Sequence, residues 1–248
     1  MISVKIFDIK QFKCFFDVVA DTESLILHFE QKGLNVNVLN KSHTCFYNVF
    51  YDSCFFDDYS VIDPVEFVVD SEEFNRVLGS GRKGDNLTIQ FEDDLIHYIF
   101  DNTGKNKRVI KTPYIDDDYG DVPIAPEIHS QAEAVFDLTS FKDIIVDADK
   151  VVKVGKLRIG TVNSNLYFKS SNDDMMDYEN VIYDSIVTGS DVSSEFTFEY
   201  LKELLKFKDI DNAITFKLGD DIPLVWDICS QDKLVKCGGL IAPRLENT

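Results

Sequence analysis

The feature that most constrains the fold is a pattern that occurs twice, about half a chain apart, in a sequence of 248 residues. Residues 85–95 read DNLTIQFEDDL, and residues 211–222 read DNAITFKLGDDI. Both segments begin with Asp-Asn, alternate into an apolar strand and turn at two aspartates followed by Leu or Ile. Residues 12–16 (FKCFF) similarly match residues 141–145 (FKDII). Because this period is far longer than the roughly 50 residues of solenoid repeats, we expect two similar modules.

Four short helices are predicted, two in each half, from apolar residues spaced three and four apart. Asp70 is expected to cap the second helix, with Glu73 placed for a capping box, and Thr139 or Ser140 to cap the third. The apolar stripes are Ile9, Phe12, Phe16 and Val19; Phe74, Val77 and Leu78; Phe141, Ile144, Ile145 and Ala148; and Phe198, Leu201, Leu204 and Leu205.

Most other periodic segments alternate apolar and polar residues and are predicted to be strands. Residues 211–228 are expected to form two strands around a turn at 218–221, followed by a polar break at 230–233 and an extended tail fixed by Pro243. Because strands outnumber helices and form meanders, we expect an α+β fold of antiparallel sheets with helices on one face. The other predicted strands are 4–8, 24–29, 34–39, 45–51, 65–69, 87–91, 95–100, 108–115, 135–138, 157–161, 166–169 and 181–187.

Residues 116–131 differ in kind from the rest of the chain. They begin with a run of aspartates, contain Pro123 and Pro126 and show no periodicity, which is typical of a linker. The predicted organisation is therefore an N-terminal domain over residues 1–115, a connector over 116–131 and a C-terminal domain over 132–248.

The composition of the chain limits the classes of function that it can have. The chain is 44% hydrophobic and 28% charged, as in ordinary globular proteins. It has no run approaching the roughly 18 apolar residues of a membrane span and no signal-peptide pattern at its start, so we expect an intracellular protein with no membrane partner. The net charge of −19 taken alone argues against nucleic-acid binding, although the distribution of the charges matters more than their sum.

The cysteines and histidines do not form a recognisable site. The five cysteines are odd in number and form no C-x-x-C pair, so neither a disulfide framework nor a zinc site is predicted. The four histidines are scattered, without metal-ligand spacing. We therefore predict no metal, no cofactor and no catalytic residue.

Several segments, in order along the whole chain, carry a family resemblance. Residues 220–225 (DDIPLV) are followed, after a hydrophilic turn, by residues 240–246 (LIAPRLE), and residues 40–43 (NKSH), 85–89 (DNLTI) and 113–116 (PYID) stand at matching places. Together they resemble the archaeal and eukaryotic sliding clamps, the proliferating cell nuclear antigen (PCNA) family. Departures at Gly238–Gly239, at Phe55 and Phe56 and at residues 173–176 (DDMM) bear on partner choice or assembly rather than on the fold.

The resemblance implies a DNA-clamp fold: two similar domains, each with antiparallel sheets outside and two helices inside. It implies that three chains, identical or paralogous, close head to tail into a ring around duplex DNA. The implied function is that of a processivity factor, not an enzyme, which binds DNA polymerase, clamp loader, flap nuclease and ligase through short peptides. The implied location is the cytoplasm or nucleoid of an archaeon or the nucleus of a eukaryote.

The ring requires a basic inner surface despite the acidic composition. Ten of the 25 lysines and arginines fall in or next to the four predicted helices. Acidic residues such as Asp17 and Glu199 share these faces, so we expect a weakly positive lining that makes weak, sequence-nonspecific phosphate contacts. The implied DNA-facing residues are Lys10, Lys13, Arg76, Arg82, Lys83, Lys142, Lys150, Lys202, Lys206 and Lys208.

The resemblance also implies a peptide pocket and a subunit contact. An apolar groove beside a strand-like tail can bind a peptide by main-chain pairing and side-chain anchors. Adding one edge strand, Lys107–Thr112, to another, Asn180–Ser185, of the next chain would join the subunits. The implied pocket residues are Leu39, His43, Thr44, Tyr119, Val122, Pro123, Pro223, Leu240, Ile241, Ala242 and Pro243, and the implied contact residues are Arg108, Ile110, Ile144, Val181 and Tyr183.

Two alternatives remain open. The first is a clamp-like adaptor that does not encircle DNA. The second is a metal-dependent hydrolase that uses the clustered carboxylates Asp116, Asp117, Asp118 and Asp121, since carboxylates can hold Mg²⁺. These carboxylates have no accompanying base or rigid support, so a solvated acidic loop is favoured over a metal site.

Overall fold

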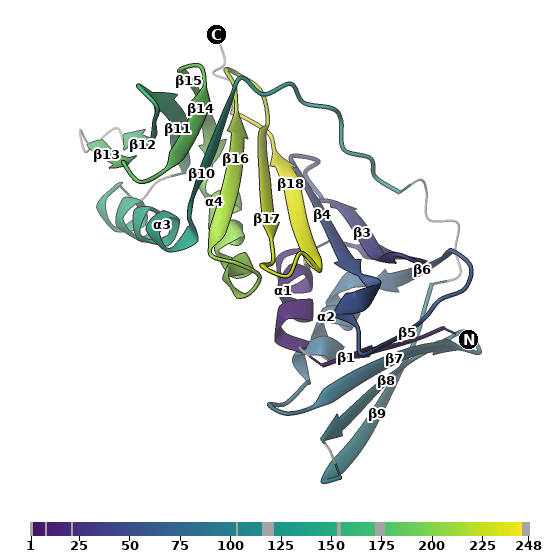
Figure 1. Ribbon diagram of the computed structural model, residues 1–248. Helices are drawn as coiled ribbons and strands as arrows, with labels where there is room; N and C mark the ends of the chain where they lie inside the picture. The colour runs from purple at the N-terminus through teal and green to yellow at the C-terminus, as the bar shows by residue number, and fades with distance from the viewer. Residues whose placement is uncertain are drawn as a thin grey trace. The chain divides into compact units, whose positions relative to one another are not determined.

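The computed structural model describes residues 2–7, 9–20, 22–102, 104–115, 122–152, 155–171 and 177–244 (Figure 1). The chain divides into two compact units. The N-terminal unit consists of Met1–His43, Tyr47–Ile124 and Ser230–Cys237, and the C-terminal unit of Thr44–Phe46, Ala125–Cys229 and Gly238–Thr248. The two predicted domain boundaries, at 115/116 and 131/132, remain predictions.

The first half of the chain forms two sheets and two helices. One sheet has the strand order β5-β1-β7-β8-β9, and another run of paired strands has the order β4-β3-β2-β6. The elements are β1 (Ile2–Ile6), α1 (Ile9–Val18), β2 (Ser24–Glu30), β3 (Gly33–Leu39), β4 (Cys45–Asp52), the 3-10 helix η1 (Ser53–Phe55), β5 (Asp58–Ser60), β6 (Val65–Asp70), α2 (Ser71–Gly79), β7 (Asn86–Glu92), β8 (Leu95–Asn102) and β9 (Asn106–Pro113).

The second half repeats this arrangement. Its strands run in the orders β14-β10-β16-β17-β18 and β13-β12-β11-β15, which match the orders of the first half position for position. The elements are β10 (Ala132–Asp137), α3 (Leu138–Val152), β11 (Lys156–Val162), β12 (Asn165–Ser171), β13 (Asp177–Ile182), β14 (Ile186–Gly189), β15 (Val192–Thr197), α4 (Phe198–Glu203), the 3-10 helix η2 (Leu204–Asp209), β16 (Ala213–Leu218), β17 (Leu224–Cys229) and β18 (Val235–Ile241). The predicted α+β fold built from a duplicated module is confirmed.

Each pair of helices packs its apolar stripe against its own unit. In α1 the side chains of Phe12, Phe15 and Phe16 are buried, and the corresponding Phe141, Ile144 and Ile145 of α3 are buried as well. Burial of a large apolar side chain stabilises the fold by about 1.5–3 kcal/mol. The duplicated motif noted at residues 12–16 and 141–145 is therefore a duplicated core contact.

Helix capping is partly as predicted. Asp70 begins α2 by accepting a hydrogen bond from the Glu73 backbone N–H at 2.7 Å. The prediction that Thr139 or Ser140 caps α3 is wrong. The Asp137 carboxylate accepts from the Thr139 and Ser140 N–H groups at 2.6 and 3.3 Å, and hydrogen bonds from Thr139, first from its side chain, lower the pKa of Asp137.

Three strand predictions need correction. The predicted strand 181–187 is two strands, β13 and β14, separated by a turn in which Tyr183 is exposed. The expected tail beyond residue 233 contains a third regular strand, β18. Strand β15 was not predicted because Ser194, a polar residue, takes an inward position and donates its hydroxyl to the Gly219 carbonyl at 2.8 Å.

No helix among the described residues is long and apolar enough to cross a membrane.

Candidate nucleic-acid interface and peptide pocket

The predicted DNA-facing residues of the N-terminal unit lie on α1, on α2 and in the loop after α2. Lys10 is exposed on α1, and Lys13 pairs with Asp17 one turn later at 3.1 Å. The Lys13 ammonium also lies against Gly79, 3.6 Å from where a β-carbon at that glycine would stand, so α1 meets the end of α2 there. Arg76 is exposed and lies 3.5 Å from Glu73. The remaining two residues, Arg82 and Lys83, are exposed in the loop.

The C-terminal unit has its predicted DNA-facing residues on α3, α4 and η2. Lys202 connects two helices, since its ammonium lies 3.0 Å from Glu199 on α4 and 3.4 Å from Asp149 on α3. The hydrogen bond to Glu199 is the main cause that raises the pKa of Lys202, so this residue is charged at neutral pH. Lys206 pairs with Glu203. The other three, Lys142, Lys150 and Lys208, are exposed.

The two helix surfaces are therefore mixed in charge, as the sequence predicts. Among the described contacts, Lys13, Arg76, Lys202 and Lys206 each have a carboxylate within 4 Å. Exposed ion pairs contribute only about 0–1 kcal/mol each. Such cations can exchange a carboxylate for a phosphate oxygen at little cost, and this chemistry favours weak and reversible contacts.

Three of the predicted pocket residues line one hollow in the N-terminal unit. Leu39, His43 and Pro123 border a cavity of about 350 Å³ together with residues of β2 and β3. The His43 backbone has a positive φ of 56°, and its N–H donates to the Asn40 carbonyl at 2.9 Å, which closes a tight turn. Val122 is half-buried. Tyr119 lies outside the described residues.

The predicted pocket residues of the C-terminal unit differ in how deeply they are buried. Ile241 is fully buried and belongs to the core. Ala242 is half-buried, and its backbone N–H donates to the Thr44 carbonyl at 2.8 Å. Pro243 forms an isolated β-bridge with Phe196. Surface for a ligand is thus left by the half-buried Leu240, Ala242, Pro243 and Pro223.

The two strands expected to join subunits are both edge strands. β9 is the last strand in the order β5-β1-β7-β8-β9, and β13 is the first in β13-β12-β11-β15. Ile110 and Val181 on these strands are half-buried, and Tyr183 is 81% exposed in the turn after β13. Ile144, by contrast, is buried in the core of its own unit.

Arg108 on β9 is held within its own unit. Its guanidinium lies 2.5 Å from the buried Asp85 carboxylate and 3.2 Å from the Ser80 carbonyl. It also lies over the Phe100 ring, 4.9 Å from the ring centre. These contacts fix the side chain before any partner arrives, so Arg108 can support a contact surface but has a structural role of its own.

One cluster of charged residues was not singled out from the sequence. Lys156, Arg158 and Lys169 line a hollow of about 740 Å³ on the C-terminal unit. The alternation of basic residues at 156 and 158 was the available signal, because positions two apart on a strand share a face.

No group of three or more His, Cys, Asp or Glu that could hold a metal ion occurs among the residues that the structure describes. The acidic run of the hydrolase alternative, Asp116, Asp117, Asp118 and Asp121, lies outside them.

Comparison with known proteins gives a consistent result. No protein-family model matches the chain. A DNA polymerase sliding clamp of Methanothermobacter thermautotrophicus is 24% identical over 232 residues, which is 93% of each chain. A DNA polymerase sliding clamp of Methanobrevibacter smithii is 24% identical over 252 residues, covering 100% of this chain and 99% of that one.

Solved structures show the same fold over nearly the whole chain. The PCNA2–PCNA3 complex of Sulfolobus tokodaii superimposes with a TM-score of 0.86 at 21% identity, over 98% of this chain and 99% of that one. The proliferating cellular nuclear antigen of Entamoeba histolytica gives a TM-score of 0.86 at 14% identity, with the same coverage. The chain therefore has the fold of the PCNA sliding clamps and resembles proteins named DNA polymerase sliding clamp over nearly its whole length.

Proposed function

We propose that this protein is a DNA polymerase processivity factor that closes into a ring around duplex DNA. The observation that carries the proposal is the duplicated fold itself, shared over nearly the full length with proteins named DNA polymerase sliding clamp. A clamp retains DNA by topology rather than by affinity. Its inner surface therefore needs many weak contacts and no base-specific ones.

The ring is proposed to close through the two edge strands. β9 of one chain would add to β13 of the next, which satisfies backbone groups that an edge strand leaves unpaired. Such a head-to-tail contact uses two different surfaces and gives a closed ring only when the rotation between chains closes. The exposed Tyr183 beside β13 is the side chain we expect to become buried on assembly.

The helix cations are proposed to face the DNA. Their mixture with carboxylates suits sliding, because each phosphate contact forms and breaks at low cost. An enzymatic role is not proposed, because the proteins that the chain resembles are named sliding clamps. We expect the location to be intracellular, with the DNA.

The hollow beside Leu39, His43 and Pro123 is proposed to accept one end of a partner peptide. On the C-terminal unit, the half-buried tail residues Leu240, Ala242 and Pro243 are proposed to provide a strand-like surface for a partner peptide. The partners proposed for this pocket are DNA polymerase, the clamp loader, a flap nuclease and a ligase.

Primer extension by a polymerase from the same organism tests the function. With a clamp loader present, the protein is expected to lengthen the products on a circular primed template. On a linear template of the same sequence the gain should be much smaller, because a ring slides off open ends. Equal gain on both templates would contradict encirclement.

Mass in solution tests the ring against the adaptor alternative. A closed ring predicts about three times the chain mass, with this chain alone or mixed with paralogues. The variant Tyr183→Arg should shift the mass toward the monomer while circular dichroism stays unchanged. A wild-type protein that stays monomeric with every paralogue would favour the adaptor.

Replacement of Lys10, Lys13, Lys202 and Lys206 by alanine tests the inner surface. We expect weaker loading and a shallower salt dependence of loading, because each lost phosphate contact lowers the salt slope by roughly one. Binding of a partner peptide should be unchanged. Loading equal to wild type would place the DNA elsewhere.

A further inference from the structure

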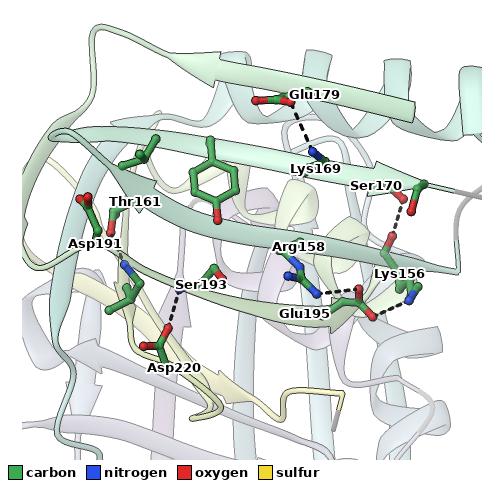
Figure 2. A pocket seen from close by; sticks show the side chains of 14 residues that line it. Lys156, Arg158, Thr161, Lys169, Ser170, Glu179, Asp191, Ser193, Glu195 and Asp220 are labelled. Atoms are coloured by element: carbon green, nitrogen blue, oxygen red, sulfur yellow. Dashed lines mark hydrogen bonds and ion pairs between the residues drawn. The ribbon is translucent and has the colours of Figure 1, made fainter. Parts of the chain in front are cut away.

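The hollow of about 740 Å³ on the C-terminal unit is open to one face of the sheet β13-β12-β11-β15 (Figure 2). The opposite face of this sheet packs on the core, as the alternating burial of β11 shows: Leu157 and Ile159 are buried, whereas Arg158 is exposed. The lining comes mainly from β11, β12 and β15, with Asp220 from the turn after β16. A hollow of this size falls within the roughly 300–1,000 Å³ of ligand sites.

Position 160 on β11 requires a glycine. A β-carbon at Gly160 would stand 2.5 Å from the Val192 carbonyl oxygen and 2.7 Å from the Tyr167 ring. Gly160 pairs with Tyr167 across β11 and β12. The Val192 backbone and the Tyr167 ring therefore occupy the space that a side chain at this position would need.

The N-terminal unit has a large side chain at the corresponding place. The β2–β3 pair matches the β11–β12 pair in register, so His28 with its partner Asn35 corresponds to Gly160 with Tyr167. The His28 ring is fixed by Glu30 at 2.7 Å and Glu66 at 2.8 Å. The duplicated sheet thus carries a histidine between two carboxylates in one unit and a glycine packed against the Tyr167 ring in the other.

Positive charge gathers at one end of the hollow. Lys156 lies 2.9 Å and Arg158 3.8 Å from the same residue, Glu195, whose side chain is only 13% exposed. Lys169 lies 3.7 Å from Glu179. The Glu195 carboxylate thus pairs with two cations, and Lys169 is a third cation in the same cluster. In a chain of net charge −19, this cluster is a local exception.

Negative charge marks the other end, as Figure 2 shows. Asp191 accepts a hydrogen bond from the Asn163 N–H at 3.1 Å, and Asp220 accepts one from the Ser193 N–H at 2.8 Å. These bonds hold the two carboxylates in place. Arg158 and Val162, near the two ends, are four residues apart on β11, which corresponds to roughly 13 Å along a strand.

We propose that this groove binds a short extended segment of a partner protein that carries acidic residues at one end and a basic residue about four positions away. The acidic end lies against Lys156, Arg158 and Lys169, and the basic end lies near Asp191 and Asp220. The spacing of the charges in the groove sets the spacing in the peptide, because both are extended chains with about 3.3 Å per residue. The Tyr167 ring offers an apolar contact in between.

A nucleic acid fits this groove less well than a peptide. A phosphate backbone carries negative charge throughout, and Asp191 and Asp220 at the other end of the groove would repel it. A peptide segment with both signs of charge finds residues of opposite charge at each end of the groove. The inference goes beyond the proposed function, which assigns partner binding to the N-terminal unit and the tail, and it does not depend on ring closure.

Fluorescence anisotropy with a labelled hexapeptide, KSLGEE, tests the proposal. Its lysine and first glutamate are four positions apart. We expect saturable binding that weakens with added salt. The same residues in the order ESKEGL, which breaks the spacing, and the neutral peptide QSLGQQ should bind at least about tenfold more weakly, a difference of roughly 1.4 kcal/mol.

The variant Arg158→Glu with Lys169→Glu should lower the affinity for KSLGEE by more than about tenfold. Its matched control, Lys32→Glu with Lys105→Glu, makes the same charge change on exposed lysines of the N-terminal unit and should bind like wild type. If the first variant melts at a lower temperature than the control, Arg158→Gln with Lys169→Gln replaces it.

Three results would overturn the proposal: equal affinity for the reordered peptide, unchanged affinity in the Arg158 and Lys169 variants, or displacement of the peptide by a short oligothymidylate, which would mark a nucleic-acid site. The assay contains no template, primer or polymerase. A failure of the peptide groove is therefore distinguishable from a failure of clamp function in primer extension.

Discussion

The corresponding sheets β4-β3-β2-β6 and β13-β12-β11-β15 agree on one face and differ on the other. Facing the core, Leu25 and Leu27 of β2 correspond to Leu157 and Ile159 of β11, and all four are buried. On the opposite face, Ser24, Ile26 and His28 correspond to Lys156, Arg158 and Gly160. Packing has kept the buried face similar in the two units, whereas the other face has been free to acquire different chemistry.

The same contrast holds for the helices. The buried positions of α1 and α3 are large and apolar in both units. The start of α2 is capped by Asp70, whereas Thr197 at the start of α4 makes no side-chain capping bond. The α4 helix is also shorter and continues as the 3-10 helix η2. Equivalent elements therefore share their core contacts but differ in what stabilises their ends.

The largest expected effect tests whether the two cores are equivalent. Phe12 lies 5.0 Å from the ring centres of both Phe16 and Tyr51, and Phe141 lies 5.5 Å from Phe216. We expect Phe12→Ala and Phe141→Ala each to lower the free energy of unfolding by about 3–5 kcal/mol, since both leave a cavity. Urea denaturation at one fixed protein concentration measures this.

Phe7→Ala is the control for these two variants. Phe7 is 70% exposed, so its replacement should change the free energy of unfolding by no more than about 0.5 kcal/mol. A loss in Phe12→Ala that is several times the loss in Phe141→Ala would show that the N-terminal aromatic cluster has a role that its counterpart lacks.

The second prediction concerns the aspartates that begin the two repeated segments. Asp85 is buried, and its carboxylate accepts from the Arg82 N–H at 2.9 Å and from Arg108. The Arg82 backbone bond, followed by the bonds from Arg108 and Asn102, lowers the pKa of Asp85 although burial opposes the shift. Asp211 accepts from the Ala213 N–H at 2.9 Å. We expect Asp85→Asn to destabilise the protein clearly more than Asp211→Asn.

The pH dependence of Asp85→Asn follows from the sign of that shift. A lowered pKa in the folded state means that the ionised carboxylate stabilises the fold above the unfolded pKa and that this contribution is lost as the pH falls through the folded pKa. The difference in unfolding free energy between wild type and Asp85→Asn should therefore be largest at neutral pH and shrink in acid. A constant difference from neutral to acidic pH would contradict this account.

The smallest expected effect concerns the helix starts. Asp70→Ala removes the capping bond to Glu73 and should cost about 1 kcal/mol. Thr197→Ala removes no capping bond, so its effect on the free energy of unfolding should be clearly smaller. Urea denaturation of both variants gives the two losses in free energy of unfolding. Equal losses would show that α2 and α4 do not differ in how their starts are stabilised.

Much of the fold is predictable from the sequence because its core is patterned regularly. Apolar spacing predicts the four helices and most strands, and the repeated segments predict two similar modules, since equivalent positions must be buried in each. The exceptions have local causes. Ser194 interrupts the apolar alternation of β15 by placing a hydroxyl in the core. The apolar residues on both sides of Asp184 and Ser185 make residues 181–187 resemble one strand, although Tyr183 lies in a turn.

The candidate sites are less predictable because they depend on how strands pair. Sequence spacing places Lys156 and Arg158 on one face, but only the pairing of β11 with β12 and β15 adds Lys169 and Glu195 to them. The close approach of the Val192 backbone to Gly160 is likewise something that no periodicity reveals. The helix cations and the tail residues are found through the family resemblance.

Gly160 has a consequence for how this surface can change over evolutionary time. Alanine at this position would bring its β-carbon to 2.5 Å from a backbone oxygen of β15, so any larger residue here requires the strand itself to move. The charged residues around the rim face no such barrier. The backbone beneath the groove is therefore constrained, whereas single substitutions at its charged rim can change the charge of the groove without moving β15.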